Sequence, residues 1–350
     1  MLLFRRIGFG KSRCHCGITF PRKQSGKIPM SPALSTPVVR SGVLAALLLA
    51  GSLTVARAED SPFPPAWQSP HARSHPLVGR ILDTASHRWI SPAELQHRLY
   101  LSRWVLLGEQ HDNPDHHTLQ AALLAGLIRD GRRPAVAVEM IGPAQSEALA
   151  QVLSDASQSA TPQDDTDALG QAVGWEQRQW PQWSWYRPIF HAALAARLEI
   201  LPANLEREQL RAAGSDASIP LPAPVLAAQT EAVVSGHCGL IAPEQALPMV
   251  RMQVARDQAM ADALLTADRH SGHGGVLIAG AGHVRRDSAV PRLLPAGQSV
   301  SVAMVEVQDD QTAIESLDTG DYDYLLLTPR ADREDPCQAL QQKLQGKSAR

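Results

Sequence analysis

Short apolar runs alternate with longer amphipathic stretches over most of the chain. The apolar runs predict β-strands at residues 104–107, 135–138, 199–202, 276–279, 300–307 and 324–327. Several of these runs are continuously apolar, which is typical of strands covered on both faces. Between them, residues with helical spacing predict helices at 114–129, 145–154, 186–197 and 243–267. This alternation predicts an α/β fold, with a mostly parallel sheet and flanking helices.

The stretch 141–267 departs from this alternation, because it holds one convincing strand and a great deal of helix. We interpret it as a helical insert or lid over the carboxyl edge of the strands. Within it, residues 155–170 are polar and predict a loop.

The composition suits an ordinary globular protein and excludes one class of partner. Of the 350 residues, 44% are apolar and 19% are charged, and the formal net charge is -2. Binding to a phosphate backbone needs clustered lysine and arginine, which this balance does not supply. We therefore expect no nucleic acid partner.

The first 58 residues have the pattern of a secretory signal peptide. A basic segment without acidic residues is followed by an apolar run at 41–55 and by the small-x-small sequence Ala56, Arg57, Ala58. The apolar run is short for a transmembrane helix. Met30 is an alternative start. We expect cleavage near Ala58, no transmembrane span in the mature chain, and a location in the periplasm or outside the cell.

Beyond the signal peptide at 1–58, composition divides the chain into three parts. Residues 59–76 are rich in proline and serine and predict an N-terminal arm rather than a packed element. Residues 77–340 carry the alternating pattern and predict a single α/β domain. Residues 341–350 form a C-terminal tail.

The mature chain would keep two cysteines, Cys238 and Cys337. In an oxidising compartment such a pair favours a disulfide over two free thiols, so we expect these two residues to be bonded. The alternative is a pair of buried, unpaired cysteines.

Ionisable and amide side chains directly follow four of the predicted strands. The first strand leads to Glu109 and His111, the second to Glu139, the third to Asn204 and the fourth to His283. In open α/β sheets, ligands bind beyond the carboxyl ends of the strands. The sequence therefore predicts that these groups gather in one cleft.

Both cleft histidines belong to Gly-x-x-His turns, at 108–111 and 280–283. Glycine lets the backbone turn sharply or approach a ligand closely. Asn113 and Pro114 predict the start of a helix just after the first turn. On that helix, His117 and Gln120 share a face and could support the cleft.

Histidine and carboxylate side chains together suit divalent-metal ligation or general acid–base catalysis. On this basis a metal-dependent hydrolase would use Glu109, His111, Glu139 and His283 as both metal ligands and catalytic residues. Histidines with a purely structural role are the alternative. A dinucleotide site is disfavoured because no third glycine follows Gly280 and Gly282, and no Gly-x-Ser-x-Gly motif supports a serine hydrolase.

Several motifs in order resemble those of the ChaN-like haem-binding uptake family, which shares a superfamily with the Tiki/TraB proteins and erythromycin-esterase-like enzymes. The resemblance covers most of residues 100–295. The motifs are GEQHDNPDHHTLQ, AVAVEM, WSWYRP, PAN, RMQVARDQAMA and IAGAGHVRRDSAVPRLL. It implies an α/β fold, an exported or membrane-anchored location, and haem binding linked to iron acquisition. The lipid-attachment cysteine of well-characterised relatives is missing here.

The resemblance also implies residues for a haem site. Four tryptophans and Tyr186 within 175–186 would form its apolar walls, or else the core of the insert. Methionines at 249, 252 and 260 would contact haem or pack in the core. The candidate haem ligands are His111, Tyr186, His237 and His283, and the candidate propionate partners are Arg251 and Arg256.

Three functions follow from these observations. The first is an exported haem-binding protein in haem or iron uptake or trafficking, whose partners are haem and either an outer-membrane haem receptor or a second copy of the chain. The second is the metal-dependent hydrolase of the Tiki branch, so whether the protein is an enzyme stays open. The third is an adaptor that binds a protein through the tryptophan-rich insert.

Overall fold

The computed structural model describes residues 66–317, 319, 322–335, 337–338 and 340–342. The chain divides into two compact units, residues 1–57 and 58–350, and the first lies outside the described residues. The predicted signal peptide, its alternative start at Met30 and most of the predicted tail also lie outside them. The description below concerns the second unit.

Eight strands form one mixed sheet in the order β2-β1-β8-β7-β3-β6-β4-β5 within the described part of the chain. The six strands from β3 to β8 run parallel to one another, and the antiparallel hairpin of β1 and β2 pairs with β8 at one edge, where β1 is antiparallel to β8. The strand bounds are β1 Ile81–Asp83, β2 Arg88–Ile90, β3 Trp104–Glu109, β4 Ala135–Val138, β5 Ile200–Pro202, β6 Gly275–Gly280, β7 Ser299–Glu306 and β8 Tyr324–Thr328.

The predicted α/β fold is confirmed, and each predicted strand is present. The hairpin of β1 and β2 was not predicted, because each strand has three residues and none of those in β2 is fully buried. Such short strands leave no apolar run in the sequence.

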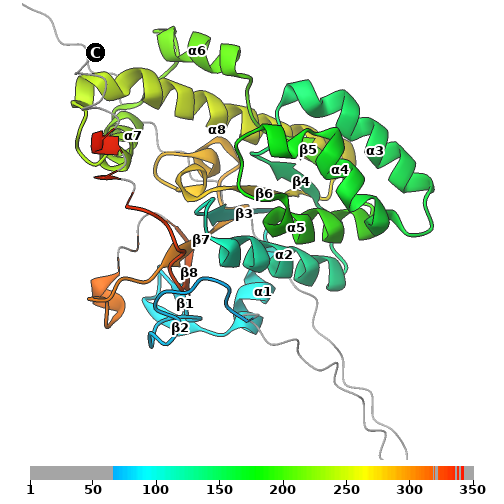
Figure 1. The fold of residues 1–350 in the computed structure, drawn as a ribbon, viewed down its shortest axis with the longest axis horizontal. Helices are drawn as coiled ribbons and strands as arrows, with labels where there is room; N and C mark the ends of the chain where they lie inside the picture. The colour runs from blue at the N-terminus through cyan, green and yellow to red at the C-terminus, as the bar shows by residue number, and fades with distance from the viewer. Residues whose placement is uncertain (1–65, 318, 320–321, 336, 339, 343–350) are drawn as a thin grey trace, which may run out of the picture. The chain divides into compact units, whose positions relative to one another are not determined.

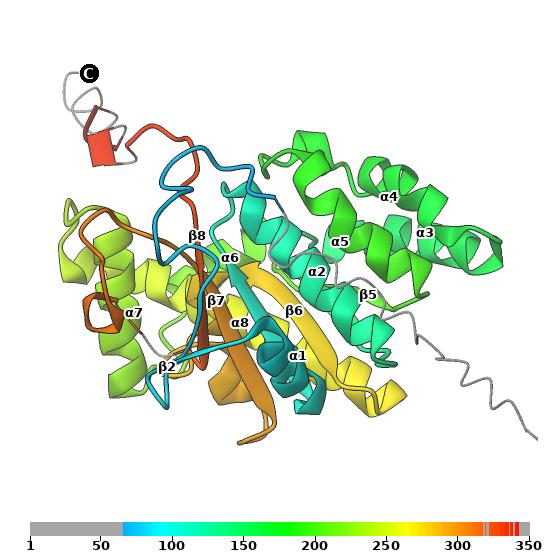
Figure 2. The same ribbon diagram turned by 90° about the horizontal axis from the view of Figure 1, so that it is seen from below.

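Helices cover both faces of the sheet (Figures 1 and 2). Their bounds are α1 Pro92–Leu101, α2 Pro114–Arg129, α3 Ser146–Gln158, α4 Thr166–Ala172, α5 Trp183–Ala195, α6 Arg207–Ser215, α7 Ala223–Gly236 and α8 Pro243–Ser271. The predicted helices correspond to α2, α3, α5 and α8, while α1, α4, α6 and α7 were not predicted. No helix in the described residues is long and apolar enough to cross a membrane.

Alternate side chains of the central strands pack on opposite faces of the sheet. Val105 and Leu107 join the cluster that includes α1, α2 and α5, whereas Leu106 joins the cluster that includes α8. Both sets are fully buried. The period-2 alternation of a strand is thus hidden in the sequence, because both faces are apolar.

The stretch 141–267 is helical as expected, and its one strand divides it. β5 pairs with β4 at the edge of the sheet. The helices before β5 and those after it pack against different helices of the sheet's cover. α3 packs on α4, which lies beside α5, and α5 packs on α2, while α6 and α7 pack on α8. The helical stretch therefore covers two sides of the molecule (Figure 1).

The N-terminal arm is packed in its described part, which corrects the expectation of an unpacked segment. The backbone N–H groups of Gln68 and Ser69 donate to the carboxylate of Asp115 in the first turn of α2. His71 forms an antiparallel bridge with Arg330. The proline and serine content was a poor guide here, because Trp67 packs against the core and the Ser69 hydroxyl donates to Asn113.

The predicted disulfide between Cys238 and Cys337 is confirmed. It joins the turn after α7 to the segment after β8, across 99 residues of sequence. In the same segment after β8, the side chain of Arg333 forms ion pairs with Asp112 and Glu306. These links hold the C-terminal segment beside the carboxyl end of the sheet.

Candidate functional site

The two Gly-x-x-His turns lie side by side because β3 and β6 are neighbouring parallel strands. Gly108 pairs with Ala279, and Glu109 pairs with Gly280. Gly108 is required by this close approach, since a Cβ there would lie 2.8 Å from the Cα of Ala281. The predicted cleft at the carboxyl ends of the strands is therefore built on two adjacent strands.

Glu109, at the end of β3, is the centre of one half of the site. Its buried carboxylate accepts a hydrogen bond from the Tyr186 hydroxyl at 2.5 Å. The same carboxylate lies 2.7 Å from Nδ1 of His111 and 2.9 Å from Nδ1 of His117. Three polar side chains from two helices and one loop thus converge on a single carboxylate.

The start of α2 positions this half of the site. The Asn113 side chain accepts from the N–H of Asp115 and caps the helix, as its sequence position predicted. One turn later, Nε2 of His117 lies 2.9 Å from the carbonyl oxygen of His111. Nδ1 of the buried His116 accepts from the N–H of Gln110 at 2.8 Å, and burial lowers the pKa of His116 to about 3. A neutral ring therefore fixes the first turn.

Glu139, at the end of β4, is the centre of the other half. Its carboxylate accepts from the N–H of Gly280 at 2.8 Å and lies 3.5 Å from Nε2 of His283. Nδ1 of His283 lies 2.6 Å from the carboxylate of Asp257 on α8. Nε2 of His111 lies 3.7 Å from Glu139, so the halves meet. We call the whole set the carboxylate–histidine cluster: Glu109, His111, His117, Glu139, Tyr186, Asp257 and His283.

Opposite charges outweigh burial at three members of this cluster, Glu109, Glu139 and His283. Burial alone would raise the pKa of Glu139, but the facing His283 holds that pKa at about 2. Burial lowers the pKa of His283, yet Glu139 and Asp257 together raise it to about 10. Burial also acts to raise the pKa of Glu109, and His117 with its neighbours holds it well below its usual range. Glu109 and Glu139 are thus ionised and His283 is protonated near neutral pH.

These pKa shifts predict a stability maximum in mildly acidic solution. The lowered pKa of Glu139 contributes stability that is lost as pH falls from about 4.5 through about 2. The raised pKa of His283 contributes stability that is lost as pH rises from about 6.5 through about 10. The free energy of unfolding should therefore fall on both sides of this window, by up to about 1.4 kcal/mol per pH unit. Urea denaturation at a series of pH values measures it.

The variant His283→Ala tests whether His283 causes the loss of stability at alkaline pH. In His283→Ala the decline above pH 6.5 should be shallower, because the ring that retains its proton in the folded state is gone. An alkaline slope that is the same in both proteins would contradict this assignment.

Two cavities meet at Gly282, beside the cluster. One cavity has a volume of about 570 Å³, and its polar lining residues include Glu109, His111, Glu306 and Arg333. The other lies between α7 and α8 and has a volume of about 440 Å³; we call it the α7–α8 slot. The slot is lined by Gln229, Ala232, Val233, Gly236, His237, Met249, Met252, Gln253, Arg256, Gly282 and His283.

The structure divides the predicted site residues into groups. Glu109, His111, Glu139 and His283 come together as predicted, and the candidate haem ligand Tyr186 joins them as a buried partner of Glu109.

The remaining candidates lie outside the cluster. His237 and Arg256 line the slot with His283. Arg251 turns to the carbonyl oxygen of Gly214, at the end of α6, and is absent from the slot lining.

The tryptophans belong to the core and not to the walls of either cavity. Trp175 is fully buried against Tyr186 and Phe190, and three other tryptophans pack on the same cluster. Trp180 also meets the ring of His111 edge-on at 5.1 Å. The α7–α8 slot contains none of them. Of the two expectations for these residues, the one that made them the core of the insert describes the structure.

Several polar residues of the site, apart from the predicted Asn204, were not assigned from sequence. His116 and Asn204, whose amide donates to the carbonyl of Glu139, hold the backbone of the cleft. Gln229 lies beside Asp257, and Arg333 reaches the first cavity from the C-terminal segment. For Asp257 the signal in the sequence is an acid amid the apolar positions of a helix, whereas no local pattern distinguishes His116, Gln229 or Arg333.

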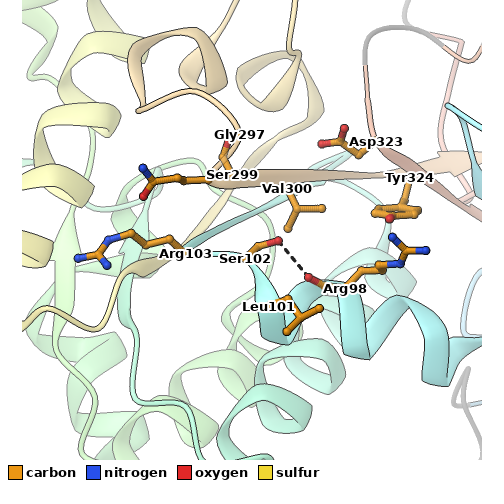
Figure 3. A pocket seen from close by; sticks show the side chains of 10 residues that line it. Arg98, Leu101, Ser102, Arg103, Gly297, Ser299, Val300, Asp323 and Tyr324 are labelled. Atoms are coloured by element: carbon orange, nitrogen blue, oxygen red, sulfur yellow. Dashed lines mark hydrogen bonds between the residues drawn. The ribbon is translucent and has the colours of Figure 1, made fainter. Parts of the chain in front are cut away.

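A third cavity, of about 540 Å³, lies at the opposite edge of the sheet, where β3 and β7 begin (Figure 3). Arg98 and Arg103 line it, but these side chains pair with Glu94 and Asp268. The hydroxyl of Ser102 donates to the carbonyl of Arg98. None of the predicted site residues lines this cavity.

The fold and the cleft define an α/β protein whose chemical groups lie at the carboxyl ends of parallel strands. The family described as "Haem-binding uptake, Tiki superfamily, ChaN" matches residues 95–294, which include most of the strands that build the cleft. The chain belongs to this family. The resemblance noted in the sequence is thereby confirmed.

One of the solved structures that resemble this chain shares its fold. A structure described as cofacial heme binding to ChaN of Campylobacter jejuni has 22% identity and a TM-score of 0.55, and the match covers 70% of this chain and 95% of that one. The type III effector HopBA1 and erythromycin esterase EreC in its open conformation each have 14% identity. Their TM-scores are 0.39 and 0.36, over 67% and 77% of this chain and 91% and 85% of theirs. No curated protein matches the chain.

Proposed function

We propose that this protein binds haem, and that it serves haem or iron uptake or trafficking without chemistry of its own. The observation that carries the proposal is the α7–α8 slot, which combines apolar walls with histidine, methionine and arginine side chains. Membership of a haem-binding uptake family and the fold shared with ChaN support it.

The slot has the features that haem requires. Sites for cofactors have volumes of about 300–1,000 Å³ and mainly apolar walls, and this slot of about 440 Å³ falls in that range. Haem iron takes histidine or methionine as an axial ligand, and His237, Met249 and Met252 are present. The buried Nε of Arg256 has no hydrogen-bond partner among the described residues. An anionic propionate would supply one.

Export is the second part of the proposal. The first 58 residues carry the basic, apolar and small-x-small pattern of a secretory signal. The confirmed disulfide agrees with an oxidising compartment. We place the mature protein in the periplasm or outside the cell, where an outer-membrane haem receptor or a second copy of the chain is its expected partner.

Hemin titration tests the proposal. The chain is expressed with its own N-terminal segment in a bacterial host, purified from the periplasmic fraction and titrated with hemin. We expect a saturable Soret band at micromolar hemin and a fixed stoichiometry. Absence of any saturable spectral change would overturn the haem function, and retention of an unprocessed chain in the cytoplasm would overturn the export.

A metal-dependent hydrolase is the second candidate. One observation favours it: Nδ1 of both His111 and His283 is bonded to a carboxylate, and both Nε2 atoms lie within 4 Å of Glu139. A hydrogen bond from the second ring nitrogen to a carboxylate is typical of histidines that bind metal. Among the described residues, however, no group of three or more histidine, cysteine, aspartate or glutamate side chains is arranged to hold an ion.

Elemental analysis separates this candidate from haem binding. A stoichiometric divalent metal in the isolated protein that is lost in His283→Ala would support the hydrolase. Its absence from the wild-type protein, together with normal hemin binding by His283→Ala, would remove that candidate.

A further inference from the structure

The third cavity, of about 540 Å³, lies at the edge of the sheet where β3 and β7 begin (Figure 3). The end of α1 and the first residues of β7 and β8 form its walls. None of the described residues that line it belongs to the carboxylate–histidine cluster or to the α7–α8 slot, which both include His283 at the carboxyl edge of the sheet. The proposed haem function therefore does not account for this cavity.

Tyr324, the first residue of β8, brings an unpaired hydroxyl to the cavity. The residue is 8% exposed and lines the cavity. Its hydroxyl forms no hydrogen bond with another described residue, whereas a buried tyrosine usually has such a partner. Burial raises the pKa of this hydroxyl, and the nearby Arg98 acts to lower it. The hydroxyl keeps its proton at neutral pH and is therefore available as a donor.

Arg98, in the last turn of α1, supplies a positive charge next to this hydroxyl. Figure 3 shows its guanidinium group beside the hydroxyl end of Tyr324. Only Nη2 of Arg98 has a hydrogen-bond partner among the described residues, and that partner is Glu94 at 3.5 Å. Both side chains of this ion pair are about half exposed. Exposed pairs of this kind contribute little to stability, so an anion in the cavity can replace Glu94 at small cost.

The other charged groups at the cavity are already paired. Asp323 is the carboxylate among the described lining residues. One of its oxygens accepts from Arg286 and the other from the N–H of Ser301, each at 2.8 Å. Arg103 pairs with Asp268 at 2.8 Å. The described part of the cavity thus offers unpaired donors and no unpaired carboxylate, which favours a ligand that supplies negatively charged oxygen atoms.

Leu101, at the end of α1, gives the same cavity an apolar rim. It is 66% exposed, more than Tyr100 or Leu240, the other large apolar residues that are exposed in the described part of the chain. Val300 adds apolar surface within the cavity (Figure 3). Ligand sites commonly combine apolar surface with a few polar groups that orient the ligand. An exposed leucine beside a cation and a free hydroxyl favours a ligand with both an apolar and an anionic part.

We propose that this cavity binds an amphipathic oxyanion, which is a carboxylate or phosphate group attached to an apolar chain. The oxyanion accepts hydrogen bonds from the Tyr324 hydroxyl and the Arg98 guanidinium, and the chain lies along Leu101. Free alkyl carboxylates and anionic phospholipids share this chemistry. Because the cavity lies at the opposite edge of the sheet, a ligand bound there leaves the carboxylate–histidine cluster and the α7–α8 slot accessible.

Two probes and two conservative changes test the proposal. Isothermal titration calorimetry measures octanoate binding, and sedimentation measures binding to vesicles of phosphatidylglycerol, with uncharged phosphatidylcholine vesicles for comparison. Tyr324→Phe removes the hydroxyl and keeps the buried ring, while Arg98→Ala removes the cation. Each change should weaken binding by about 10-fold or more, which is the cost of losing a hydrogen bond to a charged group.

Matched controls remove the same groups from positions outside the cavity lining. Tyr100→Phe takes a hydroxyl from an exposed tyrosine on α1, and Arg129→Ala takes a cation from the exposed end of α2. Both variants should bind as the wild type does. Leu101→Ala should reduce the gain in affinity between acetate and octanoate, because that gain comes from contact with the apolar chain.

The outcomes also identify the source of the ligand. Octanoate binding that is weakened in Tyr324→Phe and Arg98→Ala supports the proposal with a free carboxylate as ligand. Binding to phosphatidylglycerol vesicles alone, with the same dependence on the two variants, supports it with a phospholipid as ligand. Failure of the wild type to bind either probe would overturn the proposal. Equal binding by the wild type and both cavity variants would also overturn it, since octanoate would then occupy another place, such as the α7–α8 slot. Should Tyr324→Phe fail to fold, Arg98→Ala, on the exposed side of α1, provides the same comparison.

Discussion

Replacing Glu109 by alanine is expected to lower the free energy of unfolding by about 3–5 kcal/mol, the cost of removing one partner from a buried ion pair. Its carboxylate is the common partner of His111, His117 and Tyr186, and it is buried. Without it, three polar groups would lose a hydrogen bond in the core. Urea denaturation of wild type and variant, monitored by circular dichroism, measures the loss.

Two further variants show whether the loss of stability depends on the negative charge of Glu109 and on its buried position. Glu109→Gln keeps the shape but removes the negative charge, so it should lose stability too, though less than alanine. Glu231→Ala removes an exposed glutamate on α7 and should change stability by less than about 0.5 kcal/mol. A loss below about 1 kcal/mol in Glu109→Ala would show that the buried cluster contributes little to folding.

The sequence predicted the sheet well because its central strands are unusually apolar. The run before Glu109 is buried on both faces, and such a run has few alternatives to a central parallel strand. The same reasoning placed Glu139 and His283 at strand ends. Since parallel strands end at a common edge, their convergence followed from topology and needed no knowledge of the order β3-β6-β4.

The rest of the site depends on contacts that no local pattern encodes. Tyr186 reaches Glu109 across 77 residues, and Asp112 meets Arg333 across 221. Such pairs are set by how helices and the C-terminal segment pack on the sheet. Asp257 does carry a local signal, because an acid within an apolar helical pattern must find a buried partner.

The choice among candidate haem ligands also required the structure. From residue types alone, His111, Tyr186, His237 and His283 were equivalent. Hydrogen bonding separates them, since three belong to the carboxylate–histidine cluster and His237 donates only to its own helix. The candidate ligands thus differ in how much existing structure each would lose on binding iron.

Reducing the disulfide between Cys238 and Cys337 is expected to lower the free energy of unfolding by about 2–5 kcal/mol. The bond closes a loop of 99 residues of sequence. A cross-link restricts the unfolded chain, and the effect grows with loop length. Because Cys238 follows His237 directly, reduction should also loosen the turn that holds His237, which lines the α7–α8 slot. Denaturation of the oxidised protein and of the double variant Cys238→Ser/Cys337→Ser measures the first effect.

Hemin titration of the same two proteins separates stability from ligand placement. If the disulfide positions His237, the double variant should bind hemin more weakly even under conditions where it is fully folded, because the ring must then be ordered on binding. Equal hemin affinity in the two folded proteins would show that the bond stabilises the chain without positioning His237. Equal stability of the two would contradict the loop-closure argument itself, since the C-terminal segment would then be held by other contacts, among them the ion pairs of Arg333.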